Sequence, residues 1–376
     1  MRITVVGPTH PFKGGIAQHT AALARELSVR GHQVVVQNWD RQYPVRLYPG
    51  LLTIDEPEFP VHQPTQRLLS WNRPDSWWRV GRRAGTGDIL IVAHVNPIQV
   101  PPYRVLLAAA RGVGKKVIVA HNVLPHERSA VDRMLTVQLF RAADQIVTHS
   151  ESQRELAAGL SGVPVVLAPI APFMPPDFVL RKPSPGEHRR LLFFGLVRPY
   201  KGLDVALRAL AAGPSDVHLR VAGEFWGGTA ATEALISELE LTERVELRPG
   251  YTAAEDVPGL FADVDALVLP YRTVTGSQGV WTAFQFGVPV LVSGTGRLAD
   301  DVRDGVDGLV VPPDDVDALA GALRRFYEPG VPERMRAAVR PVDPAPYWDR
   351  YVDALLRPVD GDGPADGVPG PPRPAG

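Results

Sequence analysis

Two patterns of apolar residues alternate along this chain. Short runs rich in β-branched residues are followed by longer stretches in which apolar residues recur at helical spacing. Continuous short runs are typical of strands buried on both faces of a parallel sheet, and their alternation with helices is the pattern of βαβ units. In the N-terminal part this predicts strands at Ile3–Val6, Gln33–Gln37, Ile89–Val92, Lys116–Ala120, Gln145–Thr148 and Val165–Ala168, with helices at Ile16–Val29, Pro102–Arg111 and Val131–Ala142.

A proline-rich segment without apolar periodicity, residues 171–190, interrupts the pattern and is typical of a linker. The alternation then restarts, which predicts a second Rossmann-like domain. Its predicted strands are Leu191–Phe194, His218–Ala222, Val245–Pro249, Ala266–Leu269 and Val288–Ser293, and its predicted helices are Leu203–Ala211, Ala230–Leu239, Ala253–Ala262, Trp281–Phe286 and Asp315–Tyr327.

The length of 376 residues supports this division, because one hydrophobic core stops growing below that size. We therefore predict an α/β protein with domains at 1–170 and 191–342 and a cleft between them. A further helical pattern lies within residues 343–356. The last segment, 357–376, is mostly Gly, Pro and Asp and is predicted to be a disordered tail.

Composition narrows the possible functions. There are no cysteines, which excludes disulfides, thiolate catalysis and cysteine-based zinc sites. The net charge of −1 does not indicate nucleic-acid binding, although residues 1–180 hold 19 Lys and Arg against 13 Asp and Glu. No apolar run approaches the ~20 residues that span a bilayer. We expect a cytoplasmic protein.

The most informative loop follows the apolar run Leu191–Phe194. Arg198 and Lys201 stand in a short turn between Gly195 and Gly202, just before a predicted helix. In an open α/β sheet, ligands bind beyond the carboxyl ends of the strands, where the next helix presents free N–H groups to an anion. The two cations predict a phosphate-bearing substrate. The alternative is that both are solvated surface charges.

Two consecutive glycines, Gly14 and Gly15, follow the first predicted strand and precede the helix Ile16–Val29. Without side chains they allow close approach of a phosphate or a sugar to the backbone, and the alternative is a tight loop without a ligand. The three spaced glycines of a dinucleotide-binding loop are absent, which disfavours a nicotinamide-dependent oxidoreductase.

Taken in order, several segments resemble the glycosyltransferases of family 4, which have the GT-B fold. GPTHPFKGGIAQHT is similar to the first glycine loop and helix of that family, VIVAHNVLPHE to its active-site histidine segment and FFGLVRPYKGLDVALRAL to its phosphate-binding turn. PGYTAAEDVPGLFADVDALVLPYR and FGVPVLVSGTGRLADDVRDGVDGLVVPPDD resemble its nucleotide-side strands and closing glycines. The resemblance covers residues 1–356 and implies two doubly wound domains, with the C-terminal helix crossing back to the first.

The resemblance implies transfer of a sugar from a nucleotide-diphosphate sugar to an acceptor, with retention of anomeric configuration and without a metal or other cofactor. The implied acceptor is a lipid-linked saccharide, a polysaccharide or a small-molecule natural product, bound by the N-terminal domain. Arg198 and Lys201 are then catalytic and donor-binding, because fixed cations stabilise the charge that grows on a leaving diphosphate. Many family members carry the arginine directly after the glycine, where this chain has Leu196.

His121 matches the family histidine beside the transferred sugar and is the third predicted catalytic residue. It follows the apolar run Lys116–Ala120, where a polar side chain faces the ligand-binding edge, whereas most lone histidines are caps or core-edge residues. His126 and Glu127 follow on the same loop and are predicted to line the acceptor side. A helix cap is an equal alternative for Glu127.

The clearest departure from the family lies in residues 274–282. Many members carry two glutamates there, separated by seven residues, at positions that this chain fills with Val274 and Thr282. A subset of the family has a Ser/Gly loop instead. The predicted donor-binding residues are therefore Gly14, Gly15, Arg198, Lys201, Ser277, Gln278, Gly279 and Thr282.

Asp-x-Asp strings, typical of metal-dependent glycosyltransferases, occur at residues 263–265, 315–317 and 360–362. They precede a strand, begin a helix and lie in the tail, so none is predicted to hold a metal. Two alternatives stay open. One is a nucleotide-sugar epimerase of the same fold, and the other is a non-catalytic nucleotide-sugar-binding homologue, which the loss of both glutamates favours.

Residues 66–83 combine Trp71, Trp77 and Trp78 with five arginines. Such a basic and aromatic surface predicts peripheral contact with anionic lipid headgroups at the inner face of the membrane. The alternative is that the tryptophans belong to the core and the arginines are solvated.

Overall fold

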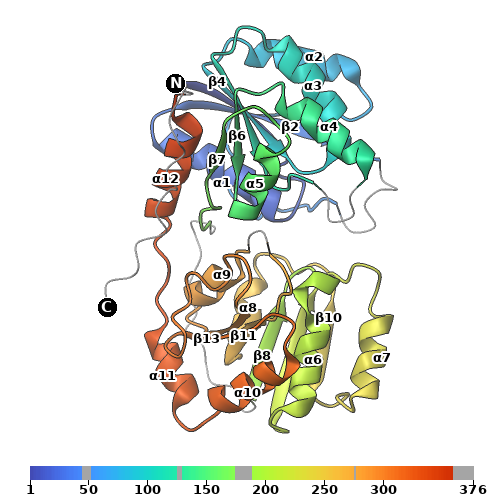
Figure 1. Ribbon diagram of the computed structural model, residues 1–376, viewed down its shortest axis with the longest axis vertical. Helices are drawn as coiled ribbons and strands as arrows, with labels where there is room; N and C mark the ends of the chain where they lie inside the picture. Colours follow the sequence, from blue (N-terminus) through green and yellow to red (C-terminus); the bar gives the residue numbers. More distant parts are fainter. Residues whose placement is uncertain (45–51, 125–128, 174–188, 275–276, 359–376) are drawn as a thin grey trace. The chain divides into compact units, whose positions relative to one another are not determined.

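The computed structural model describes residues 1–44, 52–124, 129–173, 189–274 and 277–358. It divides into two compact units, one made of residues 1–175 and 344–376 and the other of residues 176–343 (Figure 1). Each unit is a parallel sheet between layers of helices, so the predicted pair of Rossmann-like domains is confirmed.

The first unit has a seven-stranded parallel sheet in the order β3-β2-β1-β4-β5-β6-β7. The chain starts in the middle, moves outward through β2 and β3, and returns to β4 on the other side of β1, as in doubly wound dinucleotide-binding folds. The elements are β1 (Arg2–Val6), α1 (Gly15–Val29), β2 (Gln33–Arg41), β3 (Thr65–Ser70), α2 (Pro74–Ala84), β4 (Ile89–His94), the short 3-10 helix η2 (Pro97–Gln99), α3 (Val100–Ala109), β5 (Lys115–Ala120), α4 (Ala130–Phe140), β6 (Gln145–Thr148), α5 (Glu151–Ala158), β7 (Val165–Leu167) and, from the end of the chain, α12 (Ala345–Leu356).

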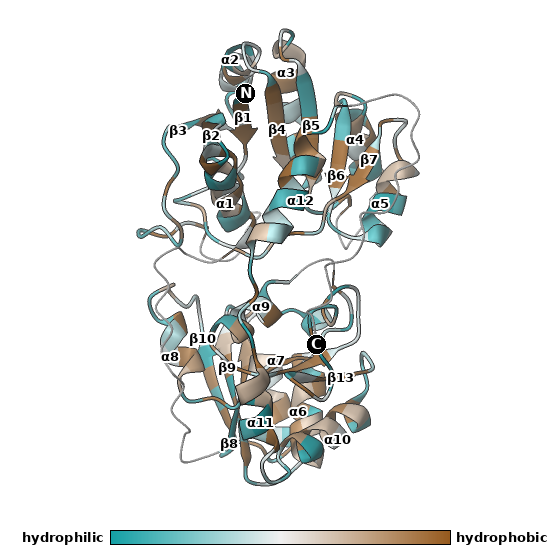
Figure 2. Ribbon diagram, turned by 90° about the vertical axis from the view of Figure 1, so that its left-hand side faces the viewer, coloured by the Kyte–Doolittle hydropathy of each residue, from teal (hydrophilic) through white to brown (hydrophobic). Residues whose placement is uncertain are grey.

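Both faces of this sheet are buried, which explains the unbroken apolar runs. In β4, Ile89 and Ile91 pack in the core that includes α1 and α12, while Leu90 and Val92 pack in the core that includes α3 and α4. β4 is accordingly coloured as hydrophobic in Figure 2. An unpaired polar side chain inside β4 would be costly, and the polar residue of this strand, His94, stands at its carboxyl end.

The second unit has a six-stranded parallel sheet in the order β10-β9-β8-β11-β12-β13, again with the chain starting in the middle. Its two faces carry separate apolar cores, one of which includes α6 and α10 and the other α8 and α9. The elements are β8 (Arg189–Phe194), the 3-10 helix η3 (Pro199–Lys201), α6 (Leu203–Ala212), β9 (Val217–Gly223), α7 (Ala230–Glu238), β10 (Val245–Pro249), α8 (Val257–Phe261), β11 (Ala266–Leu269), α9 (Gly279–Gln285), β12 (Val290–Ser293), β13 (Gly308–Val311), α10 (Val316–Phe326) and α11 (Val331–Ala338).

The last helix, α12, packs on the first unit although it follows the second in sequence. Trp348, Tyr351 and Leu355 are buried in the same core as strands β1 and β5, and the Trp348 Nε1–H donates to the Pro172 carbonyl at 2.9 Å. On its outer side Asp349 pairs with Arg30, the residue directly after α1, at 2.5 Å. The predicted crossing of the C-terminal helix to the first domain is confirmed.

Two strands and three α-helices have no counterpart in the sequence-based prediction: β3, α2, α5, β13 and α11. Helix α2 shows why, because the apolar residues on its inner side are only Trp77, Val80 and Ala84, and the helix also carries three arginines. Gly81 lies against α3 so closely that an added Cβ would come within 2.2 Å of the Leu106 carbonyl oxygen. This helix is held by close backbone packing at Gly81 together with the side chains of Trp77, Val80 and Ala84.

Boundaries also differ from prediction at a few places. The predicted linker 171–190 overlaps β8, which already begins at Arg189 and pairs there with Val217. The helix predicted at Ala253–Ala262 begins only at Val257, with Pro258 in its first turn, where a missing N–H is tolerated. The predicted disordered tail lies, from residue 359 on, outside the described residues.

Replacing Trp348 by alanine should destabilise the first unit by about 3–5 kcal/mol, because a 3% exposed indole and its hydrogen bond to Pro172 are lost. Trp78 is the matched control, since it is 54% exposed and its removal should change stability by less than about 0.5 kcal/mol. Urea unfolding followed by circular dichroism measures both. Equal stability of the two variants would contradict the packing of α12 described above.

Candidate functional site

The turn between β8 and α6 lies at the carboxyl edge of the second sheet, as the sequence predicted. β8 ends at Phe194, η3 forms one tight turn, and α6 begins at Leu203. Gly202 joins the two with a φ of +68°, and an added Cβ would lie 2.0 Å from the Pro270 carbonyl oxygen. Only glycine fits there.

Lys201 is the last residue of this turn, and its ammonium lies between two neighbouring strand ends. The Nζ atom is 5.2 Å from the centre of the Tyr271 ring, beyond β11, and a Cβ added at Gly195, beyond β8, would be 3.4 Å from it. Burial works against its charge, but interactions with Tyr271 and Tyr200 outweigh this and raise the Lys201 pKa above its ordinary value. The side chain is therefore a fixed cation at neutral pH.

Arg198 begins the same turn and stacks on an indole. Its Cζ atom is 3.5 Å from the centre of the Trp226 ring, in the loop after β9. A guanidinium stacked by its flat face keeps its in-plane N–H groups available for an oxyanion. Within the described residues neither Arg198 nor Lys201 forms an ion pair with a carboxylate.

Arg272, which sequence reasoning did not single out, holds this turn in place. Its Nη1 donates to the Pro199 carbonyl at 2.7 Å, and its backbone N–H donates to the Tyr200 carbonyl at 2.8 Å. The guanidinium also forms a bidentate pair with Asp204 in the first turn of α6, at 2.9 and 2.7 Å. That pair lowers the Asp204 pKa, chiefly through the hydrogen bonds from Arg272. The only sequence signal was a basic residue shortly after a buried strand, with Pro270 and Tyr271 between them.

The loop 277–282 is partly tied to its own helix. The Ser277 Oγ accepts from the Gly279 N–H at 3.1 Å, and the Thr282 hydroxyl donates to the Gln278 carbonyl at 2.9 Å. Both bonds lie at the start of α9, beyond the carboxyl end of β11. The predicted donor-binding roles of these four residues, and that of the turn cations, stay predictions.

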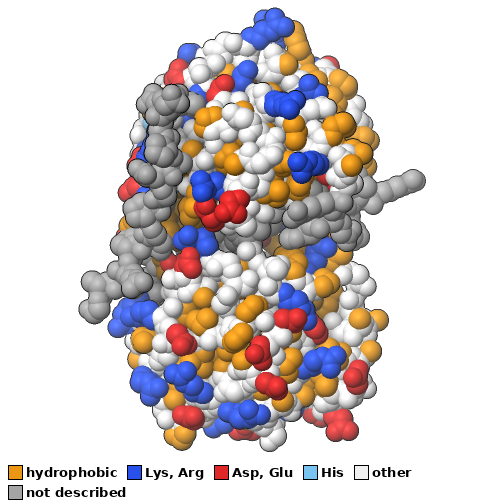
Figure 3. Space-filling view, in the orientation of Figure 1, with side chains coloured by type: hydrophobic (Ala, Val, Ile, Leu, Met, Phe, Trp, Pro, Cys, Tyr) orange, Lys and Arg blue, Asp and Glu red, His pale blue; other side chains and the backbone are white. Residues whose placement is uncertain are grey.

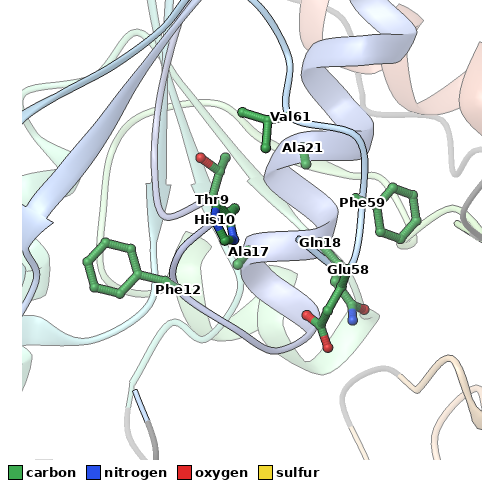
Figure 4. Close-up of a pocket in the computed structure, with 9 residues that line it drawn as sticks. All are labelled: Thr9, His10, Phe12, Ala17, Gln18, Ala21, Glu58, Phe59 and Val61. Carbon is green, nitrogen blue, oxygen red and sulfur yellow. The ribbon is translucent and has the colours of Figure 1, made fainter. Parts of the chain in front are cut away.

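In the first unit, Gly14 and Gly15 stand at the start of α1. Gly14 has a φ of +92° and open space around its Cα, so backbone conformation rather than crowding favours glycine. Its N–H donates to the Glu58 Oε2 at 3.3 Å, and Figure 4 shows this carboxylate among the residues that line a small pocket beside α1. An anion binding to the Gly14 N–H would have to displace that carboxylate.

His121 follows β5 directly and is buried, with 8% of its surface exposed. It lies in a cluster with His149, which follows β6, and His19 of α1. The rings of His19 and His149 each lie 4.9 Å from the His121 ring, centre to centre, and Nε2 of His149 is 3.2 Å from Nδ1 of His121. Sequence reasoning named His121 alone. His149 could have been found, because it too is the first residue after an apolar strand.

Burial keeps these rings neutral. It lowers the pKa of His149 to about 4, and it lowers the pKa values of His19 and His121 well below the ordinary value, with the neighbouring histidines adding to the effect. His94, at the end of β4, is also buried and has a pKa lowered to about 4. The strand ends of the first unit therefore carry uncharged imidazoles. The turn after β8 in the second unit carries cations instead.

The remaining predicted residues divide into two groups. His126 and Glu127 lie outside the described residues. Of the Asp-x-Asp strings, Asp263 pairs with Arg220 at 2.7 Å and Asp315 caps α10 by accepting from the Ala318 N–H, so both have structural partners. The part of the chain that the structure describes holds no group of three or more acidic or histidine side chains suited to a metal.

Of the three tryptophans in residues 66–83, one packs on the core and two are exposed, as a membrane-contacting surface would require. Trp77 packs against the core and donates its Nε1–H to the Ser70 carbonyl at 2.6 Å. Trp71 and Trp78 are 39% and 54% exposed, and the Arg82 guanidinium lies 5.1 Å from the centre of the Trp78 ring. Basic and hydrophobic side chains are interspersed on the surface over α2, α3 and α4 (Figure 3). No helix among the described residues has the length and apolar character needed to cross a bilayer.

The buried histidines predict a pH-dependent stability of the first unit. In the unfolded chain a histidine takes up a proton near pH 6.5, whereas His94 and His149 stay neutral in the folded state down to about pH 4. Between about pH 6.5 and 5 the unfolded state thus binds more protons, and the free energy of unfolding should fall as the pH falls. Each such histidine contributes up to about 1.4 kcal/mol per pH unit.

Urea unfolding of the wild type and His94→Gln over that pH range measures this slope. The slope of the free energy of unfolding against pH should be smaller in the variant by the contribution of one histidine, even if the substitution also changes the free energy at every pH. An identical slope for both proteins would show that His94 titrates equally in the folded and unfolded states.

Matches to known protein families cover most of the chain. Residues 13–170 match the family model described as Glycosyltransferase Family 4, and residues 188–329 match the model described as Glycosyl transferases group 1. The D-inositol 3-phosphate glycosyltransferase of Mycolicibacterium gilvum is 30% identical over 235 residues, which are 58% of this chain and 52% of that protein. The matched region is thus about half the length of this curated relative.

Solved structures agree on the fold. Anabaena HepE, determined in complex with UDP-glucose, superposes with a TM-score of 0.71 over 94% of this chain and 99% of its own, at 17% identity. Sucrose-phosphate synthase from Thermosynechococcus elongatus gives a TM-score of 0.67 over 94% of each chain, at 16% identity. With two parallel-sheet units, a C-terminal helix that returns to the first, and the two family matches, this chain belongs to the family 4, group 1 glycosyltransferases of the GT-B fold.

Proposed function

We propose that this protein is a glycosyltransferase that moves a sugar from a nucleotide-diphosphate sugar to a carbohydrate, lipid-linked or small-molecule acceptor. The observation that carries the proposal is the turn after β8, where Lys201 and Arg198 are held as cations without carboxylate partners among the described residues. Support comes from the family, from a relative named as an inositol-phosphate glycosyltransferase, and from HepE, which was determined with UDP-glucose.

The second unit is the donor-binding unit in this proposal. When the bond between the sugar and the diphosphate breaks, negative charge grows on the leaving oxygen, and two preorganised cations stabilise that charge most in the transition state. Arg272 holds the turn through its bonds to Pro199 and Tyr200, so little reorganisation is needed when the diphosphate arrives. With guanidinium and ammonium in this role, the reaction needs no metal ion.

The first unit is the acceptor-binding unit, with His121 beside the transferred sugar. A neutral imidazole suits hydrogen bonding to a sugar hydroxyl, because it carries both a donor and an acceptor nitrogen. Retention of configuration belongs to the proposal, with the acceptor attacking on the face from which the assisting diphosphate departs. The loop 277–282 supplies donor contacts in place of the two glutamates that this chain lacks.

Replacing Lys201 by alanine should lower kcat for sugar transfer by at least about 100-fold, because half of the charge facing the leaving diphosphate is removed. Lys116→Ala is the matched control, since this lysine lies at the start of β5, away from the carboxyl edge of its sheet. Release of nucleoside diphosphate from a panel of nucleotide sugars is measured with and without acceptors, together with the melting temperature of each variant.

The panel also separates the competing functions. An epimerase would convert the donor sugar without releasing nucleoside diphosphate, and a non-catalytic homologue would show a ligand-dependent rise in melting temperature without turnover. Near-normal transfer by a folded Lys201→Ala variant would contradict the role given to this turn.

The surface of α2 supports a second proposal, peripheral contact with anionic membranes. Trp78 and Arg82 stack on one another at the exposed side of the helix, with Arg79 and Arg83 also exposed. Aromatic rings with basic side chains suit the headgroup region of an anionic bilayer, where each nearby Arg contributes about 1 kcal/mol.

Flotation with phosphatidylglycerol vesicles measures this contact. The wild type should float with anionic vesicles and not with phosphatidylcholine vesicles, and the double variant Trp78→Ala, Arg82→Ala should lose at least half of its bound fraction. Arg208→Ala, an exposed arginine of α6, is the control and should bind normally. Equal recovery of the wild type with both vesicle types would remove the proposal.

A further inference from the structure

The hydrogen bonds around His149 and His121 show which ring nitrogen of each histidine carries the hydrogen. Nδ1 of His149 lies 3.0 Å from the Ala168 carbonyl oxygen, which can only accept a hydrogen bond. Nδ1 of His149 must therefore carry a hydrogen. A neutral imidazole has only one such hydrogen, so its Nε2 carries a lone pair instead.

The same reasoning extends to His121. The bare Nε2 of His149 lies 3.2 Å from Nδ1 of His121, and it can take part in a hydrogen bond only as the acceptor. Nδ1 of His121 therefore carries the hydrogen, and its Nε2 is left with a lone pair. That Nε2 is buried and has no hydrogen-bond partner among the described residues.

The surroundings of the pair keep both rings neutral, which the assignment requires. The ring of His19 meets that of His121 edge-on, and Tyr351 of α12 stacks on His149 at 5.9 Å between centres. The titratable groups that act on His121 are three other histidines, His149, His19 and His94, and no carboxylate is among them. With no carboxylate acting on His121 within the part of the chain that the structure describes, protonation of its buried ring is unfavourable.

We propose that His149 is a positioning residue, which fixes His121 as the Nδ1–H tautomer and so directs the Nε2 lone pair of His121 to accept a hydrogen bond from a substrate hydroxyl. A buried acceptor without a partner is costly, and a sugar or acceptor hydroxyl is the class of group that satisfies it. The inference rests on the proposed function for the identity of that hydroxyl. The tautomer itself depends only on the chain from Ala168 through His149 to His121.

Nitrogen-15 NMR of protein labelled at histidine measures the tautomer directly, without any substrate. A His121→Gln variant identifies the His121 signals by their loss. In the wild type, His121 should show a protonated Nδ1 and an unprotonated Nε2. A proton on Nε2 instead would overturn the proposal, because the ring would then face the substrate as a donor.

Variants of His149 test its role. In His149→Leu the partner of the His121 Nδ1–H is gone, so the His121 ring should become a mixture of tautomers, and kcat/KM for sugar transfer should fall roughly tenfold. His149→Gln keeps an acceptor for His121 and a donor for Ala168, so it should restore the single tautomer and most of the activity. His32→Gln, directly before β2 at the amino edge of the sheet and beside the Met1 amino group, is the control and should leave the His121 tautomer unchanged.

Each outcome decides one of the two proposals. An unchanged His121 tautomer in His149→Leu would show that His149 does not set it. If the leucine variant does not fold, the wild-type spectrum and the glutamine variant still decide the tautomer. A wild type with the expected tautomer but no transfer from any nucleotide sugar would refute the proposed function and leave the assignment of the hydrogens intact.

Discussion

The burial of both sheets on both faces is the constraint on which the rest of this structure depends. Strands such as β4 and β5 pack apolar side chains into a core on each side, so an unpaired polar group along them would be costly. In β4 and β5, polar residues accordingly stand only at the strand ends. His121, His149 and the turn after β8 all occupy such positions, which is why chemistry and topology coincide here.

The two carboxyl edges differ in electrostatic character, and packing decides the difference. In the second unit, aromatic rings of Trp226 and Tyr271 stabilise the cations Arg198 and Lys201 without neutralising them. In the first unit, complete burial makes the charged form of each imidazole unfavourable. One edge thus suits an anionic ligand, and the other suits uncharged hydroxyl groups.

The C-terminal helix links the end of the chain to the histidine cluster. Trp348 and Tyr351 of α12 pack around His19 and His149, whereas the histidines themselves come from α1 and the end of β6. The interior of the first unit is therefore completed only by residues that follow the whole second unit in sequence. This long-range contact explains why α12 belongs to the first core despite its position.

The sequence alone determined the class of fold, because apolar runs, helical periodicity and strand-end glycines are local signals, and it also identified the Arg198–Lys201 turn. It did not identify α2, an arginine-rich helix with few apolar residues on its inner side, or Arg272, whose partners Pro199 and Asp204 are about 70 positions away in sequence. Only the tertiary structure brought His19, His121 and His149 together, because their contacts join a helix to the ends of two strands. Local periodicity specifies what each segment becomes, while burial, pKa and tautomer depend on neighbours that are distant in the chain.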